Sequence, residues 1–286
     1  MNKVGLIFDS TAIVPQEMAE KYGFEFVSLY LDIDGTSHLS TSIDEKEFLA
    51  NFASYQSLKS ASPSPQAFVD AYEKQFAKGF EKIIVLPLSS KLSATHDVAL
   101  IARGLLDESK QDKVIVLDTL VCSLGFDSLM QSMYPFLDQD LEAEALVKII
   151  LDHAENSTIL FEINDLKNLY RGGRLKKLSL IFGEILGFKP LVEFDDGVLN
   201  VIAKNRNRNK NVEIILNKIG ELSKTFKKVY VNHFAFNLDD AAVRIILEHL
   251  RQQFSNVIIN FTSRICPVYI SHVGNSGYAI AITAHN

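Results

Sequence analysis

Short, continuously apolar runs alternate with amphipathic stretches through the first half of this 286-residue chain. The runs are residues 3–8, 24–33, 82–88 and 113–118. Each is too uniformly apolar to leave one face in water, which is typical of strands buried on both faces of a sheet. Between the runs, apolar residues keep helical spacing at Val69, Tyr72 and Phe76 and again at Val98, Ile101, Ala102 and Leu105. Strands separated by helices pair in parallel, so the pattern predicts an α/β fold.

The strand pattern changes after residue 157, where a second unit is expected to begin. Its predicted strands are residues 158–163, 190–204, 228–234, 256–261, 267–272 and 277–283. Asp196 and Gly197 stand between two apolar runs, the usual signal of a tight hairpin, so this sheet should include antiparallel pairing. A helix is expected over residues 239–250. We therefore predict two α/β domains, 1–157 with a mainly parallel sheet and 158–286 with a mixed sheet.

Composition and charge exclude several classes of function. A net charge of −6 argues against nonspecific binding to nucleic acid and offers no basic helix to a DNA-binding regulator. Cys122 and Cys266 lie far apart and form no Cys-x-x-Cys pair, so neither a metal site nor a disulfide framework is expected, and a reducing cytoplasm is the natural setting. No stretch approaches ~18 uninterrupted apolar residues and no leader pattern opens the chain, so neither export nor stable membrane insertion is expected.

Ligands of open α/β sheets bind beyond the carboxyl ends of the strands, so polar residues that follow strands are candidates for a site. Such stretches, rich in hydroxyl groups, are residues 9–11, 60–65, 89–96, 122–127, 171–174, 204–210 and 271–277, together with Thr119 and His233. An ordinary structural role remains open for each of them. Asp9, Ser10, Thr11 and Ser93 could cap helices, Pro65 could mark a helix start, and the two Gly of residues 171–174 could form a turn.

Three enzymatic interpretations can be weighed from the residues alone. A phosphatase of the haloacid dehalogenase type needs a second carboxylate two positions after the first, and Thr11 occupies that place after Asp9. A kinase needs a phosphate-binding loop of the pattern Gly-x-x-x-x-Gly-Lys-Ser/Thr, which the chain lacks. A serine hydrolase remains the alternative, because Ser93, His272 and Asp9 could meet in space, although no Gly-x-Ser-x-Gly elbow is present.

Taken in order, the polar stretches resemble the DegV family over the whole chain. The matching segments read "FDST", "SASPSP", "LSSKLSATH", "VLDTLVCSLGFD", "LKNLYRGGRL", "GFKPLVEFDDGVL", "KNRNRNK" and "PVYISHVGNSGYAI". Members whose activity is understood are bacterial fatty-acid-binding proteins that present a fatty acid to a separate ATP-dependent fatty acid kinase. The resemblance implies a non-catalytic carrier without a cofactor, which holds the lipid between and within two α/β domains. Its acyl phosphate would pass to a downstream acyltransferase for phospholipid synthesis.

The resemblance also assigns roles to residues. It places Ser93, Ser60 and His272 at the fatty-acid carboxylate. A supporting group around the pocket is Asp9, Ser10, Thr11, Ser62, Thr95, Ser123, Arg171 and Arg174. The basic residues that would dock the kinase are Lys204, Arg206 and Arg208. Candidates for the tail pocket, each equally explained as ordinary core, are Ile181, Phe182, Ile185, Leu186 and Phe188.

The chain departs from the family pattern at four places. The family's usual Thr-Ser-Gln-Pro-Ser is replaced over residues 60–64, its Leu-Ser-Gly-Thr over 92–95, and its Gly-Pro-Gly over 274–276. Asp127 stands where a second glycine is frequent. We expect these changes to alter the shape of the pocket or its preference for chain length without removing the head-group donors.

Overall fold

The computed structural model describes residues 3–164, 166–175 and 187–286. Its strands are β1 (Val4–Asp9), β2 (Glu25–Val27), β3 (Tyr30–Ile33), β4 (Thr36–Leu39), β5 (Leu58–Ala61), β6 (Lys82–Leu86), β7 (Val114–Val116), β8 (Ser157–Glu162), β9 (Lys189–Asp195), β10 (Val198–Asn205), β11 (Lys228–Ala235), β12 (Val257–Phe261) and β13 (Tyr278–His285). The longer helices are α3 (Pro65–Ala77), α4 (Thr95–Gly104), α6 (Leu124–Leu137), α7 (Ala143–Glu155), α9 (Arg208–Thr225) and α10 (Ala241–Gln253). The shorter ones are α1 (Gln16–Tyr22), η1 (Ser40–Ser42), α2 (Glu45–Asn51), η2 (Phe52–Ser54), α5 (Glu108–Gln111), α8 (Lys167–Arg171) and α11 (Pro267–Val273).

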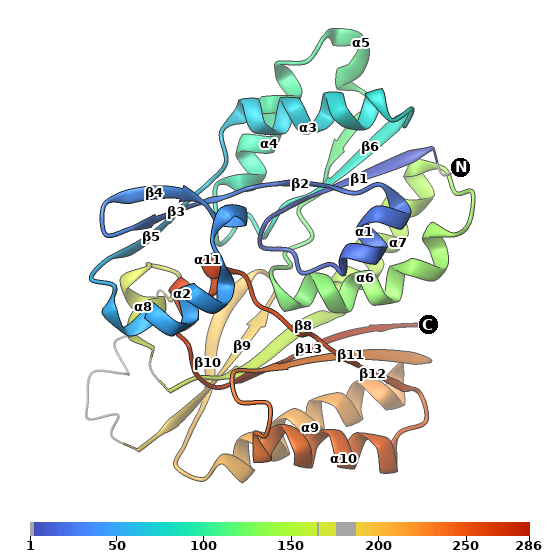
Figure 1. Cartoon of the computed structure of the whole chain (residues 1–286). Helices are drawn as coiled ribbons and strands as arrows, with labels where there is room; N and C mark the ends of the chain where they lie inside the picture. Colours follow the sequence, from blue (N-terminus) through green and yellow to red (C-terminus); the bar gives the residue numbers. More distant parts are fainter. Residues whose placement is uncertain (1–2, 165, 176–186) are drawn as a thin grey trace.

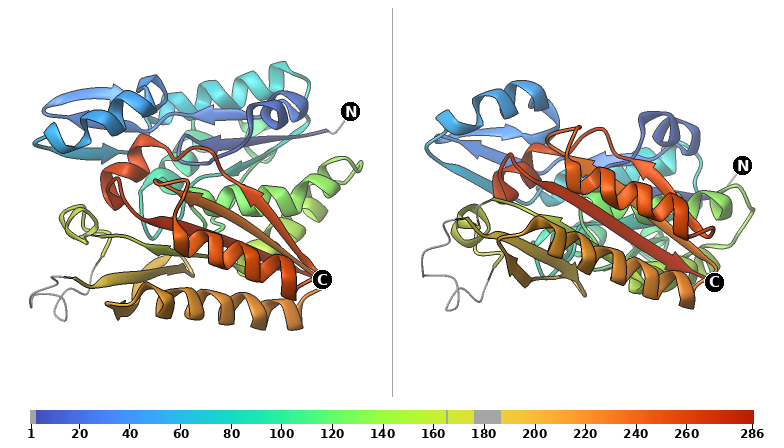
Figure 2. Two further views of the ribbon diagram at one scale, coloured as in Figure 1. Left: turned by 60° about the horizontal axis from the view of Figure 1, so that its bottom comes forward. Right: turned by 90° about the horizontal axis from the view of Figure 1, so that it is seen from below.

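Two main sheets are stacked with helices between and outside them (Figure 1). A four-stranded parallel sheet has the order β2-β1-β6-β7, and a six-stranded mixed sheet has the order β10-β9-β8-β13-β11-β12. Helices α3 and α4 cover the outer face of the parallel sheet, while α9 and α10 cover the outer face of the mixed sheet (Figures 1 and 2). The predicted α/β class, with one parallel and one mixed sheet, is confirmed.

The helix α6 lies between the two sheets and explains the apolar character of its sequence. Eleven of its residues are buried, and it packs against β11 and β13 of the mixed sheet. One continuous core therefore joins both sheets, with Phe8 from β1 and Phe161 from β8 in the same cluster. Since α6 precedes residue 157 yet contacts the second sheet, the division of the chain into domains 1–157 and 158–286 stays a prediction.

Two predicted strands are wrong. The run 24–33 divides into β2 and β3, which belong to different sheets. The chain leaves the first sheet at Leu29, whose N–H donates to Ser10 Oγ instead of to a strand. The run 267–272 is the helix α11, because Cys266 Sγ accepts from Tyr269 N at its start and Pro267 occupies the first turn, where its fixed φ suits a helix.

The hairpin predicted at Asp196 and Gly197 is present between β9 and β10. Its tip reaches across to the loop after β6, where Ser89 Oγ donates to Gly197 O and Lys91 Nζ contacts Asp196 Oδ2 at 2.8 Å. Gly197 has φ +71°, and a Cβ there would lie 2.6 Å from Ser89 Oγ. The hairpin thus connects the mixed sheet to the carboxyl edge of the parallel sheet, where the candidate site lies.

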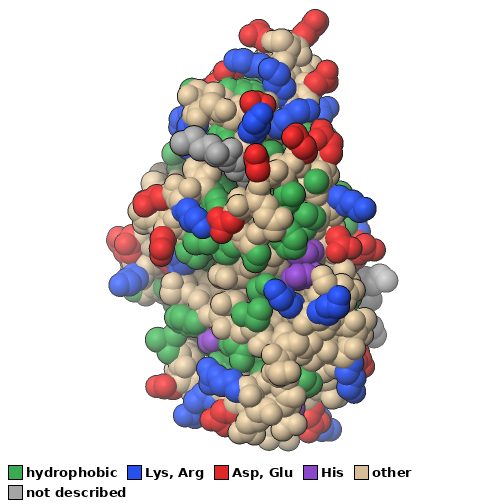
Figure 3. Space-filling view, turned by 90° about the vertical axis from the view of Figure 1, so that its right-hand side faces the viewer, with side chains coloured by type: hydrophobic (Ala, Val, Ile, Leu, Met, Phe, Trp, Pro, Cys, Tyr) green, Lys and Arg blue, Asp and Glu red, His purple; other side chains and the backbone are tan. Residues whose placement is uncertain are grey.

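Over the three described ranges, no helix is both long enough and apolar enough to cross a lipid bilayer. Figure 3 shows the face that lies on the right-hand side of Figure 1. On this face, acidic and basic side chains are interspersed with several small patches of apolar side chains.

Candidate functional site

An apolar cavity of about 50 Å³ lies where the parallel sheet, the small β4-β3-β5 sheet, α8 and α11 meet. It is lined by Thr11, Leu29, Ser60, Leu88, Leu92, Ser93, Cys122, Leu169, Arg174, Leu199, Val268, Tyr269, His272 and Val273. All three residues assigned to the carboxylate are in this set, although 212 positions separate Ser60 from His272. Apolar side chains make up most of the wall, with a few polar groups among them, which is the usual composition of a small-molecule site.

Ser60 and His272 form a direct pair in the cavity. Ser60 on β5 places its Oγ 2.9 Å from His272 Nε2, in the last turn of α11. Burial, with the nearby positive charge of Arg174, lowers the pKa of His272 to about 4, so the imidazole is neutral at neutral pH. On its other side, Gly172 packs so closely that a Cβ there would lie 2.6 Å from Nδ1. The glycine pair of residues 172–173 therefore makes room for the histidine as well as forming a turn.

Ser93 belongs to a second group of hydroxyls. Its Oγ lies 3.2 Å from Ser62 Oγ and 2.9 Å from Thr95 Oγ1, and it accepts from Thr95 N at 3.3 Å at the start of α4. The ordinary explanation of Ser93 as a helix-start residue is thus correct in part, and it does not exclude binding. A hydroxyl can donate to a ligand while still accepting a backbone hydrogen bond.

Arg174 supplies the positive charge on the cavity wall. Its Nε donates to Leu92 O at 3.1 Å and its Nη1 donates to Gly172 O at 2.5 Å. These two carbonyl acceptors leave several of its five N–H donors available, and within the described ranges no carboxylate pairs with it. Arg171, three residues earlier, is exposed at the end of α8 and does not line the cavity.

Asp9 and Ser10 have structural partners. Asp9 is fully buried, and its two carboxylate oxygens accept from Thr11 N at 2.8 Å and Leu88 N at 2.6 Å. Burial raises the pKa of Asp9, and these hydrogen bonds act against that rise. Ser10 Oγ lies 2.6 Å from Ser40 Oγ and accepts from Leu29 N, so it fastens the small sheet to the parallel one. Thr11 alone of the three lines the cavity.

A Ser93-His272-Asp9 triad is not assembled. The imidazole contacts Ser60 rather than Ser93, and Asp9 is committed to backbone N–H groups. The Ser60-His272 pair lacks an acidic third member among the described residues, since Gly172 and Arg174 adjoin the ring instead. A histidine with a pKa of about 4 is also a weak general base. The geometry disfavours a serine hydrolase.

The remaining assigned residues do not line the cavity or fall outside the described part of the chain. Ser123 is fully buried at the start of α6 with φ +45°, and it does not line the cavity. The tail candidates Ile181, Phe182, Ile185 and Leu186 fall outside the described residues. Phe188 is half-buried, and the guanidinium of Arg206 lies 4.7 Å from the centre of its ring.

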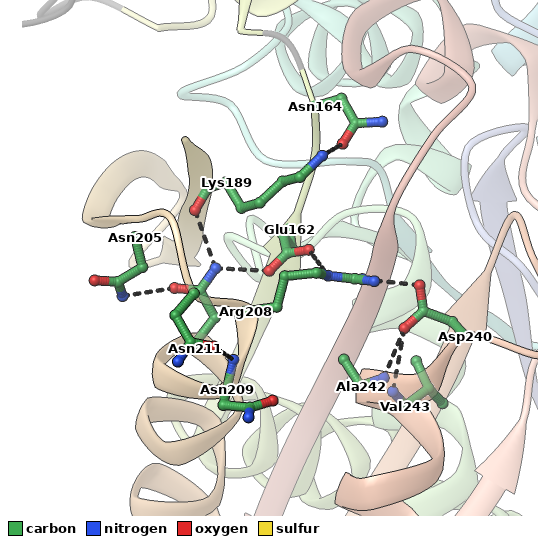
Figure 4. Close-up of polar contacts among 11 residues, drawn as sticks. Glu162, Asn164, Lys189, Asn205, Arg208, Asn209, Asn211, Asp240, Ala242 and Val243 are labelled. Atoms are coloured by element: carbon green, nitrogen blue, oxygen red, sulfur yellow. Dashed lines mark hydrogen bonds and ion pairs between the residues drawn. The ribbon is translucent and has the colours of Figure 1, made fainter. Parts of the chain in front are cut away.

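The three residues assigned to kinase docking differ from one another. Lys204 and Arg206 are exposed on or just after β10, whereas Arg208 is held in a cluster of ion pairs at the start of α9 (Figure 4). Arg208 Nε donates to Glu162 Oε1 at 2.5 Å and Nη2 donates to Asp240 Oδ2 at 2.8 Å. Asp240 Oδ1 in turn caps α10 by accepting from Ala242 N. Arg208 therefore joins two helix starts to the mixed sheet.

Several cavity residues could not be identified from the sequence. The apolar run 267–272 predicts a strand, which gives no reason to group Val268 and Tyr269 with His272, whereas in the helix α11 all three share a face. Leu199 reaches the cavity from the hairpin that contacts Ser89 and Lys91. Cys122 and Cys266 are free, buried thiols, and Cys122 is on the wall. Within the described ranges, no group of three or more His, Cys, Asp or Glu could hold a metal ion.

Comparison with known proteins matches this fold as a whole. A family model described as "Uncharacterised protein, DegV family" matches residues 3–285. A DegV domain-containing protein of Clostridium perfringens is 29% identical over 97% of this chain and 98% of its own. A DegV lipid-binding protein of Thermotoga maritima is 26% identical, with a TM-score of 0.82 and 99% of each chain covered. The Fatty Acid Kinase (Fak) B3 protein of Streptococcus pneumoniae, loaded with linoleic acid, has a TM-score of 0.83 at 20% identity over 100% of both chains. This chain belongs to the DegV family.

Proposed function

We propose that this protein binds a long-chain fatty acid in the cavity beside α11 and presents its carboxylate to a separate ATP-dependent fatty acid kinase. It performs no catalysis of its own and carries the fatty acid or acyl phosphate, in the cytoplasm, toward an acyltransferase of phospholipid synthesis. The lipid bound by the Thermotoga maritima and Streptococcus pneumoniae relatives supports this proposal. So does the absence of a phosphate-binding loop from the sequence.

One observation carries the proposal: Arg174 brings a positive charge to the wall of an apolar cavity, and no carboxylate of the described residues pairs with it. A buried carboxylate must be matched by donors or its desolvation cancels the gain from the tail. Arg174, the hydroxyls of Ser60 and Ser93, and neutral His272 supply donors of that kind. A neutral imidazole can donate to the carboxylate only from a protonated nitrogen, so we expect His272 to carry its proton on Nε2 when the ligand is bound.

The tail provides the affinity. Burying some ~14 methylenes at ~0.8 kcal/mol each gives on the order of 11 kcal/mol before the entropy costs of binding. The cavity volume of about 50 Å³ is a third of the ~150 Å³ cavity that accepts a benzene molecule, so side chains must move when the tail enters. Binding of the lipid is therefore coupled to rearrangement of the cavity wall.

We assign docking of the kinase to the exposed basic residues of the 204–210 stretch, with Arg206 as the principal contact. Arg208 contributes indirectly, since its ion pairs with Glu162 and Asp240 hold the start of α9 and the turn before it. Local positive charge on a chain with net charge −6 can steer an acidic partner surface, most strongly at low ionic strength.

The test is native mass spectrometry of the purified protein, together with an ATPase assay. We expect noncovalently bound fatty acid, no hydrolysis of ATP and no turnover of an ester substrate. Delipidated protein should bind a fluorescent fatty acid again with a stoichiometry of one. A protein that stays lipid-free in every preparation and does not bind the analogue would contradict the carrier proposal. Ester hydrolysis that Ser60→Ala abolishes would favour a hydrolase instead.

A further inference from the structure

The helix α11 presents two successive turns to the cavity. Val268, Tyr269, His272 and Val273 all line it, a spacing that places them on one face. Tyr269 and His272 are separated by three residues, or ~4.5 Å along a helix axis. One side of α11 thus places His272, assigned to the carboxylate, and the bulky ring of Tyr269 next to each other on the same cavity wall.

Tyr269 and His272 are both half-buried on the cavity wall, and their neighbours differ. The phenol of Tyr269 is near the thiols of Cys122 and Cys266, which are only 2% and 3% exposed. Burial, with these thiols, raises the pKa of the phenol well above its usual range. His272 instead adjoins Arg174, which is half-buried, and Ser60 at the edge of the small sheet. A tail that runs along this wall from a carboxylate at His272 meets the Tyr269 ring one turn earlier in α11.

No hydrogen bond from the described part of the chain fixes the Tyr269 hydroxyl, whereas its backbone N–H is tied to Cys266 Sγ. The ring is held by packing in the large core cluster alone. It is the bulkiest apolar side chain on the wall of a cavity of about 50 Å³. The space available to a tail depends strongly on this one ring.

We infer that Tyr269 determines the acyl chain length that the protein accepts, its ring narrowing the space open to the tail. This inference rests on the proposed binding of fatty acids and names the residue that selects among them. A methylene that meets a closed wall is rejected by ~10-fold or more, as in other apolar pockets. Acids longer than the path should therefore bind more weakly than shorter ones, despite their larger apolar surface.

The experiment is competition between myristic and stearic acid for the delipidated protein, measured by displacement of a fluorescent analogue. Tyr269→Leu and Tyr269→Met remove the ring, and both residues are good helix formers that suit α11. Met is flexible enough to fill an irregular gap if the smaller Leu destabilises the core. In either variant, the affinity for stearic relative to myristic acid should rise by ~10-fold or more. Tyr269→Phe keeps the ring, and its ratio should equal that of the unmodified protein.

The outcomes separate the two proposals. If the unmodified protein binds neither acid, the fatty-acid function itself fails. If it binds both and the ratio stays constant in folded Tyr269→Leu and Tyr269→Met, Tyr269 does not select chain length. A Tyr269→Phe variant that changes the ratio as much as Tyr269→Leu would also overturn the inference, because the hydroxyl rather than the ring would then be responsible. Lipid extracted from each variant should show the same shift toward longer chains by mass spectrometry.

Discussion

Arg208 and Arg174 are both half-buried cations, yet their surroundings differ in kind. Arg208 lies between two carboxylates, Glu162 and Asp240, so its charge is matched within the protein (Figure 4). Among the described residues, Arg174 donates to the backbone carbonyl oxygens of Leu92 and Gly172 and meets no carboxylate, so within that part of the chain its charge is unmatched beside an apolar cavity. A matched charge stabilises a fold, whereas an unmatched one at a cavity is available to an anionic ligand. The comparison separates two arginines that look alike in the sequence.

The largest expected effect tests the structural side of this comparison. Arg208→Met should lower the free energy of unfolding by about 2–3 kcal/mol, because it leaves the buried carboxylates of Glu162 and Asp240 without a cation. The value is below the ~3–5 kcal/mol of a fully buried pair because Arg208 is 34% exposed. Urea denaturation measures the loss. The exposed Arg244 of α10 is the matched control, and Arg244→Met should change stability by less than ~0.5 kcal/mol. If both variants lost the same free energy of unfolding, the ion pairs of Arg208 would not stabilise the fold more than an exposed arginine does.

Arg174→Met should show the opposite pattern. We expect fatty acid affinity to fall by about 3 kcal/mol, near the upper value for hydrogen bonds to charged groups, while the stability of the lipid-free protein is kept or rises. Relief of an unmatched, partly buried charge is the physical reason for the second expectation. Displacement of a fluorescent fatty acid and urea denaturation measure the two quantities. Exposed Arg171→Met is the control, and full affinity in Arg174→Met would contradict the assignment.

Removal of a single neutral donor should have a smaller effect. Ser93→Ala and His272→Ala should each weaken fatty acid binding by about 1.5 kcal/mol, or roughly tenfold, because each removes one hydrogen bond to a charged group. The double variant should lose less than the sum, since both residues act on the same carboxylate. Displacement of a fluorescent fatty acid, measured with the two single variants and the double variant, completes this double-mutant cycle. If all three bind as the unmodified protein does, Ser93 remains a helix-start residue and His272 a structural histidine.

The pH dependence of stability gives a more gradual effect. Burial lowers the pKa of His153 to about 4, with its stacked neighbour His285 adding to the shift, and burial beside Arg174 lowers that of His272 to about 4. In the unfolded chain histidine titrates near ~6.5, so only the unfolded state gains these protons between pH ~6.5 and ~4. Stability should therefore fall as the pH falls through that window. His153→Gln should show a shallower slope in urea denaturation at several pH values. An unchanged slope would mean that His153 is protonated in the folded state.

The smallest expected effect on the protein itself concerns Arg206. Arg206→Glu should change stability by less than ~0.5 kcal/mol and leave the lipid content unaltered, because the side chain is exposed. If Arg206 docks the kinase, acyl phosphate formation with the partner should decrease, most clearly at low ionic strength. Reversal of Arg208 is a poor test of docking, because it also breaks the ion pairs at the start of α9. Simultaneous loss of lipid and stability in Arg206→Glu would indicate a structural role.

The sequence by itself determined the layered α/β architecture and the hairpin at Asp196 and Gly197. These follow from apolar periodicity and turn chemistry, which are encoded within short segments of chain. The family resemblance likewise brought Ser60, Ser93 and His272 into one candidate site before their contacts were known. Their role at a carboxylate stays a prediction, although all three line one cavity.

Only the tertiary structure decided whether residues 267–272 form a strand or a helix and which arginines pair with carboxylates. Residues 267–272 are as apolar as a strand, yet the Cys266 cap and Pro267 make them a helix, which turns Tyr269 toward the cavity. Arg208 and Arg174 could not be distinguished from their neighbours in sequence, because Asp240 is 32 positions from Arg208 and Leu92 is 82 positions from Arg174. Whether a buried charge has a partner depends on such distant contacts, and that dependence is why the site required the folded chain.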